Sequence, residues 1–210
     1  MRKIVIIGGG GHAKVLISVL KKIEEFTILG YTDRKDNGTI LGIPYLGTDH
    51  GLNVILSSNP SCSAAIGIGG VRISERRKEI VKELESIGFD LPPITSRFAI
   101  VNECVEIGQG SVVFDGAVIN TGTVIGRYSI LNTNSTVDHD CHIGDYVHIA
   151  PGVTISGDAR IGNNSFIGAG ATIIQGVTIA DNCLIGAGAV VVEDCHTPGT
   201  YVGVPARRVK

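Results

Sequence analysis

The sequence predicts two folds in one chain: a small α/β domain built on a parallel sheet, followed by a solenoid of short β-strands. Two observations predict this division. Apolar strands alternate with helical segments in the first part of the chain, and an unbroken six-residue repeat runs from Val101 to His196. Because proline interrupts helices and strands alike, Pro92-Pro93 marks the boundary. The predicted domains are residues 1–91 and 92–210.

The first domain opens with an apolar strand, Lys3 to Ile7, that runs into four glycines and then a helix. The apolar face of this helix is expected to consist of Val15, Leu16, Val19, Leu20 and Ile23. The apolar runs Phe26–Tyr31 and Ala64–Ile68 predict two further strands. Residues Ser74 to Ile87 predict a charged amphipathic helix, with Ser74 as its N-cap and Gly88 just past its end. Strands that alternate with helices favour a parallel, Rossmann-like sheet.

A ligand of this domain is expected beyond the carboxyl ends of the strands, where the glycines and Asp33 fall. Glycine allows the backbone to approach a phosphate closely, and the helix N-terminus supplies free N–H groups. The pattern Gly8-x-Gly10-x-x-Ala13 satisfies the dinucleotide fingerprint, but the spacing to Asp33 is long and a domain of this length forms half of a dinucleotide fold. A mononucleotide or a nucleotide-sugar fits better. The alternative is a glycine turn that only lets strand and helix pack.

The six-residue repeat places one large aliphatic residue in each of sixteen consecutive units. These first-position residues are Val101, Ile107, Val113, Ile119, Ile125, Leu131, Val137, Ile143, Ile149, Ile155, Ile161, Ile167, Ile173, Ile179, Ile185 and Val191. The fifth position is always small: Val105, Ser111, Ala117, Thr123, Ser129, Ser135, Cys141, Val147, Val153, Ala159, Ser165, Ala171, Val177, Cys183, Ala189 and Cys195. A period of six fits neither a helix nor an ordinary strand.

Fixed-period self-similarity of this kind indicates a solenoid whose units stack to bury their apolar residues. Three units make one triangular turn, with the large residue inside the prism and the small residue near a corner. The repeat then forms about five turns and stands roughly 25 Å tall at the spacing of paired strands. The alternative, a sandwich of short strands, calls for irregular strand lengths and is disfavoured.

Composition excludes several classes of partner. The chain has 18 Lys and Arg against 20 Asp and Glu, a net charge of -2 and a pI near 6.3, so it lacks the positive field that binds nucleic acid. Its longest apolar run at the N-terminus is too short for a signal peptide, and no segment has membrane-spanning length. A cytoplasmic protein is expected. Three of the five cysteines occupy the small inward position and no CxxC pair occurs, so they are interpreted as core residues.

One unit, Val137 to His142, carries the densest group of titratable side chains in the repeat. Its third residue, His139, is the candidate general base, because a neutral imidazole accepts a proton near pH 7. One turn later stands Gly157, which leaves a slot beside the ring and a backbone N–H for a developing oxyanion. A carboxylate such as Asp140 would raise the basicity of the imidazole and fix its tautomer. The alternative is a set of wall residues that hydrogen-bond to solvent.

Four stretches together resemble a known family. They are Ile6-Ile7-Gly8-Gly9-Gly10-Gly11-His12, Ala65-Ile66-Gly67-Ile68-Gly69, Val137-Asp138-His139-Asp140-Cys141-His142-Ile143-Gly144 and Val202-Gly203-Val204-Pro205-Ala206-Arg207. In this order, over nearly the whole chain, they are similar to the NeuD/PglD-like sugar O/N-acyltransferases. The resemblance implies that the prism is the left-handed parallel β-helix of the hexapeptide acyltransferases, an exception to the right-handed crossover rule.

The resemblance also implies roles for particular residues. A nucleotide-sugar would be held in the first domain by Gly10, Gly11, His12, Asp33, Arg34, Gly67 and Gly69. The catalytic pair would be His139 and Asp140, the latter being Glu in some members. Acetyl-CoA would lie in a groove between neighbouring prisms of a homotrimer, against His148, Gly157, Ala169 and Ala187. The basic tail with Arg207, Arg208 and Lys210 would meet the phosphates of the coenzyme or remain solvated.

The function implied is transfer of an acetyl group from acetyl-CoA to the 4-amino group of a UDP- or GDP-linked sugar, for bacterial glycan biosynthesis. No metal is expected, because His139, His142 and His148 point to different faces of a triangular coil. The sequence leaves the base of the nucleotide open, and it leaves open an O-acetyltransferase acting on sialic acid or another sugar hydroxyl. A noncatalytic or metal-binding β-helix trimer is the rival from another class.

Overall fold

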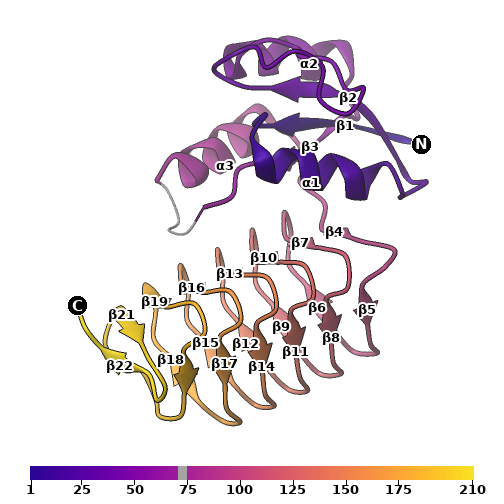
Figure 1. Cartoon of the computed structure of the whole chain (residues 1–210). Coiled ribbons are helices and arrows are strands. Elements are labelled where there is room, and N and C mark those ends of the chain that lie inside the picture. The colour runs from indigo at the N-terminus through magenta and orange to yellow at the C-terminus, as the bar shows by residue number, and fades with distance from the viewer. Residues whose placement is uncertain (71–74) are drawn as a thin grey trace. The chain divides into compact units, whose positions relative to one another are not determined.

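A computed structural model describes residues 1–70 and 75–210, and the chain divides into two compact units (Figure 1). The first unit comprises Met1–Gly70 together with the described residues up to Pro92, and the second comprises Pro93–Lys210. The predicted N-cap Ser74 lies outside the described residues.

The first unit is built on a three-stranded parallel sheet in the order β2-β1-β3. The strands are β1 (Arg2–Ile7), β2 (Phe26–Thr32) and β3 (Ser63–Ile66), and the helices are α1 (Gly11–Leu20), α2 (Leu52–Ser58) and α3 (Glu75–Ile87), with a short 3-10 turn at Asp49–Gly51. The prediction of a small parallel sheet with helices is confirmed. The short helix α2 was not predicted.

The buried face of α1 differs from the predicted one. Ala13, Leu16, Ile17, Val19 and Leu20 are buried, whereas Val15 is 43% exposed. Positions 13, 16, 17 and 20 follow the spacing of one helix face, and position 15 lies nearly opposite position 17. Ile23 follows the end of the helix. The prediction for Val15 was therefore wrong, and Ile17 takes its place in the core.

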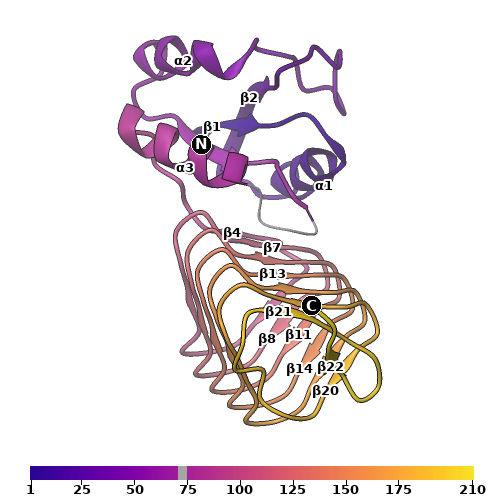
Figure 2. The same cartoon turned by 90° about the vertical axis from the view of Figure 1, so that its left-hand side faces the viewer.

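The second unit is a left-handed parallel β-helix with three walls (Figure 2). The first wall contains β4 (Ile94–Thr95), β7 (Val112–Val113), β10 (Ile130–Leu131), β13 (His148–Ile149), β16 (Phe166–Ile167), β19 (Cys183–Ile185) and β21 (Gly199–Val202), with β22 (Arg207–Arg208) antiparallel at its edge. The second contains β5 (Ile100–Val101), β8 (Val118–Ile119), β11 (Thr136–Val137), β14 (Thr154–Ile155), β17 (Thr172–Ile173) and β20 (Val190–Val191). The third contains β6 (Glu106–Ile107), β9 (Val124–Ile125), β12 (His142–Ile143), β15 (Arg160–Ile161) and β18 (Thr178–Ile179).

Along each wall a residue pairs with the residue eighteen positions later, as in Thr136↔Thr154. The coil starts at β4, one unit before Val101, so it forms about six turns where five were predicted. The last coil breaks the period, because Ile185 pairs with Tyr201 only sixteen residues later. The hairpin of β21 and β22 follows there.

Almost all first-position residues lie inside the prism, as predicted. The exceptions are Val101, which is 36% exposed, and the half-buried Ile107, both in the first coil. The small fifth position often carries a buried hydroxyl group, and these hydroxyl groups are hydrogen-bonded. Ser129 Oγ donates to the Gly144 carbonyl at 2.9 Å and accepts the Val147 N–H at 2.9 Å. A serine is tolerated in the core because its hydroxyl both donates to and accepts from the backbone of the next coil.

The fourth position of every unit from residue 104 to residue 188 has a positive φ. This left-handed conformation makes each corner and favours Gly, Asn and Asp, which the repeat supplies at most of these positions. At the corner between the third and first walls, a Cβ on Gly162 would lie 2.4 Å from Asp181 N. The glycines of this corner therefore permit the close stacking of successive coils.

Candidate active site

The corner between the second and third walls, here called the His139 corner, carries His139, Asp140 and Gly157. Strand β11 ends at Val137, and the chain turns at Asp140, whose φ is +57°. The turn brings the Asp140 carboxylate beside the ring, with Nδ1 of His139 2.8 Å from Oδ2. Nδ1–H therefore donates to the carboxylate, and Nε2 keeps its lone pair. The contact that the sequence left open is present.

Gly157 stacks against the imidazole, as the eighteen-residue register predicts. A Cβ at this position would lie 2.7 Å from both Cε1 and Nε2 of His139, so any larger residue collides with the ring. Gly157 is buried, and its N–H makes no hydrogen bond within the described part of the chain. The half-exposed ring thus lies against a buried glycine whose N–H has no acceptor in the described part of the chain.

A ladder of side chains that sequence reasoning missed supports this corner. Asn102 Nδ2 donates to Asn120 Oδ1 at 2.6 Å, and Asn120 Nδ2 donates to Asp138 Oδ1 at 2.8 Å. The same oxygen of Asp138 accepts the backbone N–H of His139 at 2.8 Å. The three polar residues are spaced by eighteen, and this spacing was the signal that could have revealed them.

Hydrogen bonds and nearby charges shift the pKa values of His139 and Asp138 at this corner. The hydrogen bond to Asp140 raises the pKa of His139 above its ordinary value, and the charge of Asp138 adds to this effect, while desolvation opposes it. The hydrogen bond from Asn120 lowers the pKa of Asp138, with a further contribution from the His139 N–H. Asp138 stays ionised and the imidazole becomes a stronger base.

The other residues expected at acetyl-CoA lie elsewhere on the β-helix. His148 stands on β13 in the first wall, with its ring edge-on to Phe166 at 5.1 Å between centroids. Ala169 and Ala187 are exposed at the corner between the first and second walls. A single chain brings Gly157 to His139, but it does not bring His148, Ala169 and Ala187 to that corner.

The basic tail is partly engaged within the chain. The guanidinium of Arg208 donates to the Pro198 carbonyl at 3.1 Å. Arg207 donates to the carbonyl of Ala206 at 2.9 Å and lies 3.6 Å from Glu193. Lys210 is exposed. Arg208 thus links the two strands of the C-terminal hairpin, whereas the contacts of Arg207 are local and solvent-exposed.

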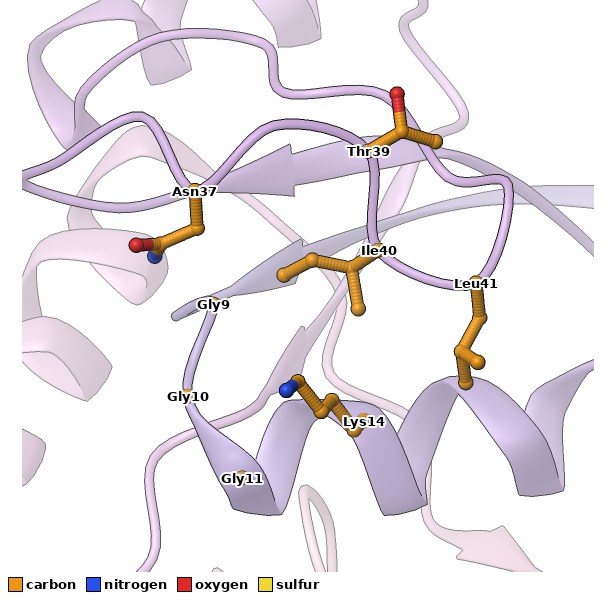
Figure 3. Close-up of a pocket in the computed structure, with 8 residues that line it drawn as sticks. All are labelled: Gly9, Gly10, Gly11, Lys14, Asn37, Thr39, Ile40 and Leu41. Carbon is orange, nitrogen blue, oxygen red and sulfur yellow. The ribbon is translucent and has the colours of Figure 1, made fainter.

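The first unit contains a cleft of about 400 Å³ beside the N-terminus of α1 (Figure 3). Its lining consists of Gly9, Gly10, Gly11, Lys14, Asn37, Thr39, Ile40 and Leu41. The first turn of α1 has neither a side-chain cap nor an acidic residue, so its N–H groups and the ammonium of Lys14 favour an anion. Gly10 and Gly11 are where the sequence placed them. Gly9, Lys14 and the segment 37–41 were missed.

The remaining residues expected at the nucleotide do not line this cleft. Asp33 accepts the Gly9 N–H at 2.6 Å through Oδ2, so its carboxylate holds the glycine turn. Arg34 is exposed after β2. The ring of His12 would touch a Cβ on Gly69 at 3.0 Å, and a Cβ on Gly67 would lie 2.9 Å from Ala13. These two glycines are explained by the packing of α1 on the sheet.

The described residues contain no group of three His, Cys, Asp or Glu side chains arranged to hold a metal ion. No helix among residues 1–70 and 75–210 has both the length and the apolar character needed to cross a bilayer.

A β-helix of six-residue units with a His-Asp pair at one corner is typical of a hexapeptide transferase, and the profile of the bacterial transferase hexapeptide family (six repeats) matches residues 122–157 and 158–193. The profile of the PglD N-terminal domain matches residues 3–84. The chain belongs to the NeuD/PglD-like sugar O/N-acyltransferase family. No curated protein matches the chain.

Several solved structures resemble the whole chain. The acetyltransferase domain of PglB from Neisseria gonorrhoeae FA1090 is 35% identical, with full coverage of both chains and a TM-score of 0.89. It has also been solved with acetyl coenzyme A. PerB from Caulobacter crescentus, in complex with CoA and GDP-perosamine, is 34% identical over 99% of this chain and 97% of that chain, with a TM-score of 0.91. WeeI from Acinetobacter baumannii AYE is 28% identical, with full coverage of both chains and a TM-score of 0.86.

Proposed function

We propose that this protein transfers the acetyl group of acetyl-CoA to the amino group of a nucleotide-linked amino sugar, with His139 as the general base. The observation that carries the proposal is the His139-Asp140 pair, with Nδ1 2.8 Å from the carboxylate and the ring lying over Gly157. Two similar proteins add support, because one is an acetyltransferase domain solved with acetyl coenzyme A and the other was solved with CoA and GDP-perosamine.

The proposed reaction is a direct displacement. The amine nitrogen of the sugar attacks the thioester carbonyl carbon, and its proton passes to Nε2 of His139. The carbon-sulfur bond then breaks, and coenzyme A leaves as a thiolate that the imidazolium can protonate. Asp140 accepts the Nδ1–H throughout and stabilises the positive charge on the ring. The raised pKa of His139 matches this role, since a stronger base takes the proton more readily.

The oxyanion that develops on the carbonyl needs a donor, and we assign this role to the Gly157 N–H. That group is buried beside the ring and pairs with no acceptor of the described chain. A preorganised donor at the point where negative charge develops is worth about 10²- to 10³-fold in rate. No acyl-enzyme is required, because the amine itself is the nucleophile.

For acetyl-CoA we propose His148, Ala169 and Ala187, together with Gly157, in a homotrimer. His148, Ala169 and Ala187 occupy a wall and a corner remote from His139 in one chain, whereas Gly157 contacts the His139 ring. A site that needs both sets is therefore complete only when the corner of one subunit meets the first wall of the next. The exposed alanines leave room for a long, flexible ligand. Cytoplasmic localisation is part of the same proposal, as the donor is a cytoplasmic metabolite.

For the nucleotide we propose the cleft of the first unit. Gly10 and Gly11 would bind the diphosphate through backbone N–H groups, and Lys14 would add a positive charge. Asp33 contributes indirectly, because its bond to the Gly9 N–H holds the turn in place. We propose that His12, Arg34, Gly67 and Gly69 lie around this turn and support it.

The test is acetyl-CoA turnover, followed by thiol release, against a panel of UDP- and GDP-linked 4-amino-sugars and their 4-hydroxy counterparts. One amino sugar should be a substrate, and the matching hydroxy sugar should not. His139→Ala should lower turnover by roughly 10²-fold or more while nucleotide-sugar binding persists. His142→Ala, three residues along on the exposed face, is the matched control and should remain active. Near-full turnover by His139→Ala would overturn the assignment.

A further inference from the structure

A tight turn at one side of the nucleotide cleft carries an unusual residue. Ile40 and Ile43 exchange two backbone hydrogen bonds, of 3.0 and 2.8 Å, around the two-residue loop Leu41-Gly42. Both loop residues have positive φ, +49° and +78°. A turn of this kind has the type I′ signs and favours Asn-Gly, because few side chains tolerate a left-handed backbone. A leucine at its first position is strained.

Packing does not explain this strain. The side chain of Leu41 is 52% exposed, so the core gains little from it. It lies instead at the edge of the cleft, across from the glycine turn and near Lys14 (Figure 3). A strained backbone that presents an apolar side chain to a cleft is a feature of ligand-binding sites.

The turn is also held in position relative to the opposite wall. Lys21, at the C-cap of α1, donates its ammonium to the Leu41 carbonyl. The same helix forms the other wall through its N-terminal residues Gly11 and Lys14. The cleft thus has hydrogen-bond donors and a positive charge at one side, and the apolar side chains of Ile40 and Leu41 at the other.

We propose that Leu41 is a nucleotide-contacting residue whose side chain packs against the nucleoside of a bound nucleoside diphosphate. This rests on the proposed function, in which the glycine turn and Lys14 hold the diphosphate. The faces of a base and a ribose are the flat, weakly polar surfaces that an exposed aliphatic side chain covers favourably. Burial of the Leu41 side chain under the ligand then offsets the strain of a leucine at a position that suits asparagine.

The test measures binding and stability together in the full chain. Leu41→Asn and Leu41→Gly both fit the left-handed backbone and both remove the apolar side chain. We expect each to weaken binding of UDP or GDP, whichever the protein binds, about tenfold by calorimetry, with binding of inorganic pyrophosphate unchanged. The Tm should be unchanged or higher, since the strain is relieved. Lys14→Gln should instead weaken nucleotide and pyrophosphate alike.

Val54→Asn is the matched control, because Val54 is a 68% exposed apolar residue on α2 outside the cleft. It should leave all affinities unchanged. If the unaltered protein binds nucleotide and both Leu41 variants bind it equally well, this inference is overturned while the proposed function stands. Equal losses for nucleotide and pyrophosphate would overturn it too, by assigning Leu41 to the shape of the turn. Failure of the unaltered protein to bind UDP or GDP would defeat the proposed nucleotide site itself.

Discussion

Gly157→Ala tests the stacking of the catalytic corner with a single methyl group. The new Cβ would lie 2.7 Å from Cε1 and Nε2 of His139, whereas ordinary contacts begin at 3.4 Å, so the ring must move by about 0.7 Å. Gly157 is not among the residues with positive φ, and its backbone accepts alanine without strain. The substitution therefore acts on the imidazole alone.

The magnitude follows from that displacement. A misplacement of a catalytic group by about 1 Å costs roughly 10²-fold in rate, and we expect a loss of turnover near this size. Stability should change by less than about 1 kcal/mol, because alanine reduces the entropy of the unfolded chain and the half-exposed ring can move outward. The two effects separate the roles of the glycine in catalysis and in folding.

The assay is thiol release from acetyl-CoA at saturating sugar, paired with thermal unfolding. Gly51→Ala is the control, because Gly51 has open space around the added methyl and an ordinary φ of -82°. Full turnover by Gly157→Ala would refute the reasoning, as would a large loss of Tm, which would show that the glycine serves the fold.

Two further predictions concern the same β-helix. Asp138→Asn keeps an acceptor for the His139 N–H but removes a charge that raises the pKa of His139. Because neutral imidazole is the active form, the acidic limb of the pH profile of kcat/KM should move to lower pH. An unmoved limb would contradict the role of Asp138. Gly162→Ala should destabilise the protein by about 1–3 kcal/mol in urea unfolding, because its Cβ would lie 2.4 Å from Asp181 N; unchanged stability would mean that the coils can separate without cost.

The repeat made much of the β-helix predictable. In a solenoid each residue meets the one a full turn away, so counting eighteen identified Gly157 as the neighbour of His139. The same count could have found Asn102, Asn120 and Asp138, whose ladder went unnoticed. Contacts across one turn are set by chain connectivity, and they can therefore be predicted by counting along the sequence.

The contacts of the first unit were harder to predict from the sequence because they join distant segments. The fingerprint located Gly10 and the family resemblance located Gly11, but the other wall of the cleft comes from residues 37–41, an irregular loop with no periodic pattern. Asp33 was expected at a ligand and instead holds the Gly9 N–H across the sheet. Such contacts depend on how loops fold back onto the strands, and local pattern does not encode this.

By itself, the sequence determined the two-part architecture, the buried positions of the coil and the stacking of His139 on Gly157, because all three follow from periodicity. Only the tertiary structure decided that Asp140 reaches Nδ1, through a left-handed corner at Asp140. It also decided that Leu41 faces a cleft and that His148, Ala169 and Ala187 lie away from the His139 corner. Side-chain direction at a corner and the contacts between distant loops are set by backbone torsions and packing. The residue pattern alone does not determine either of these.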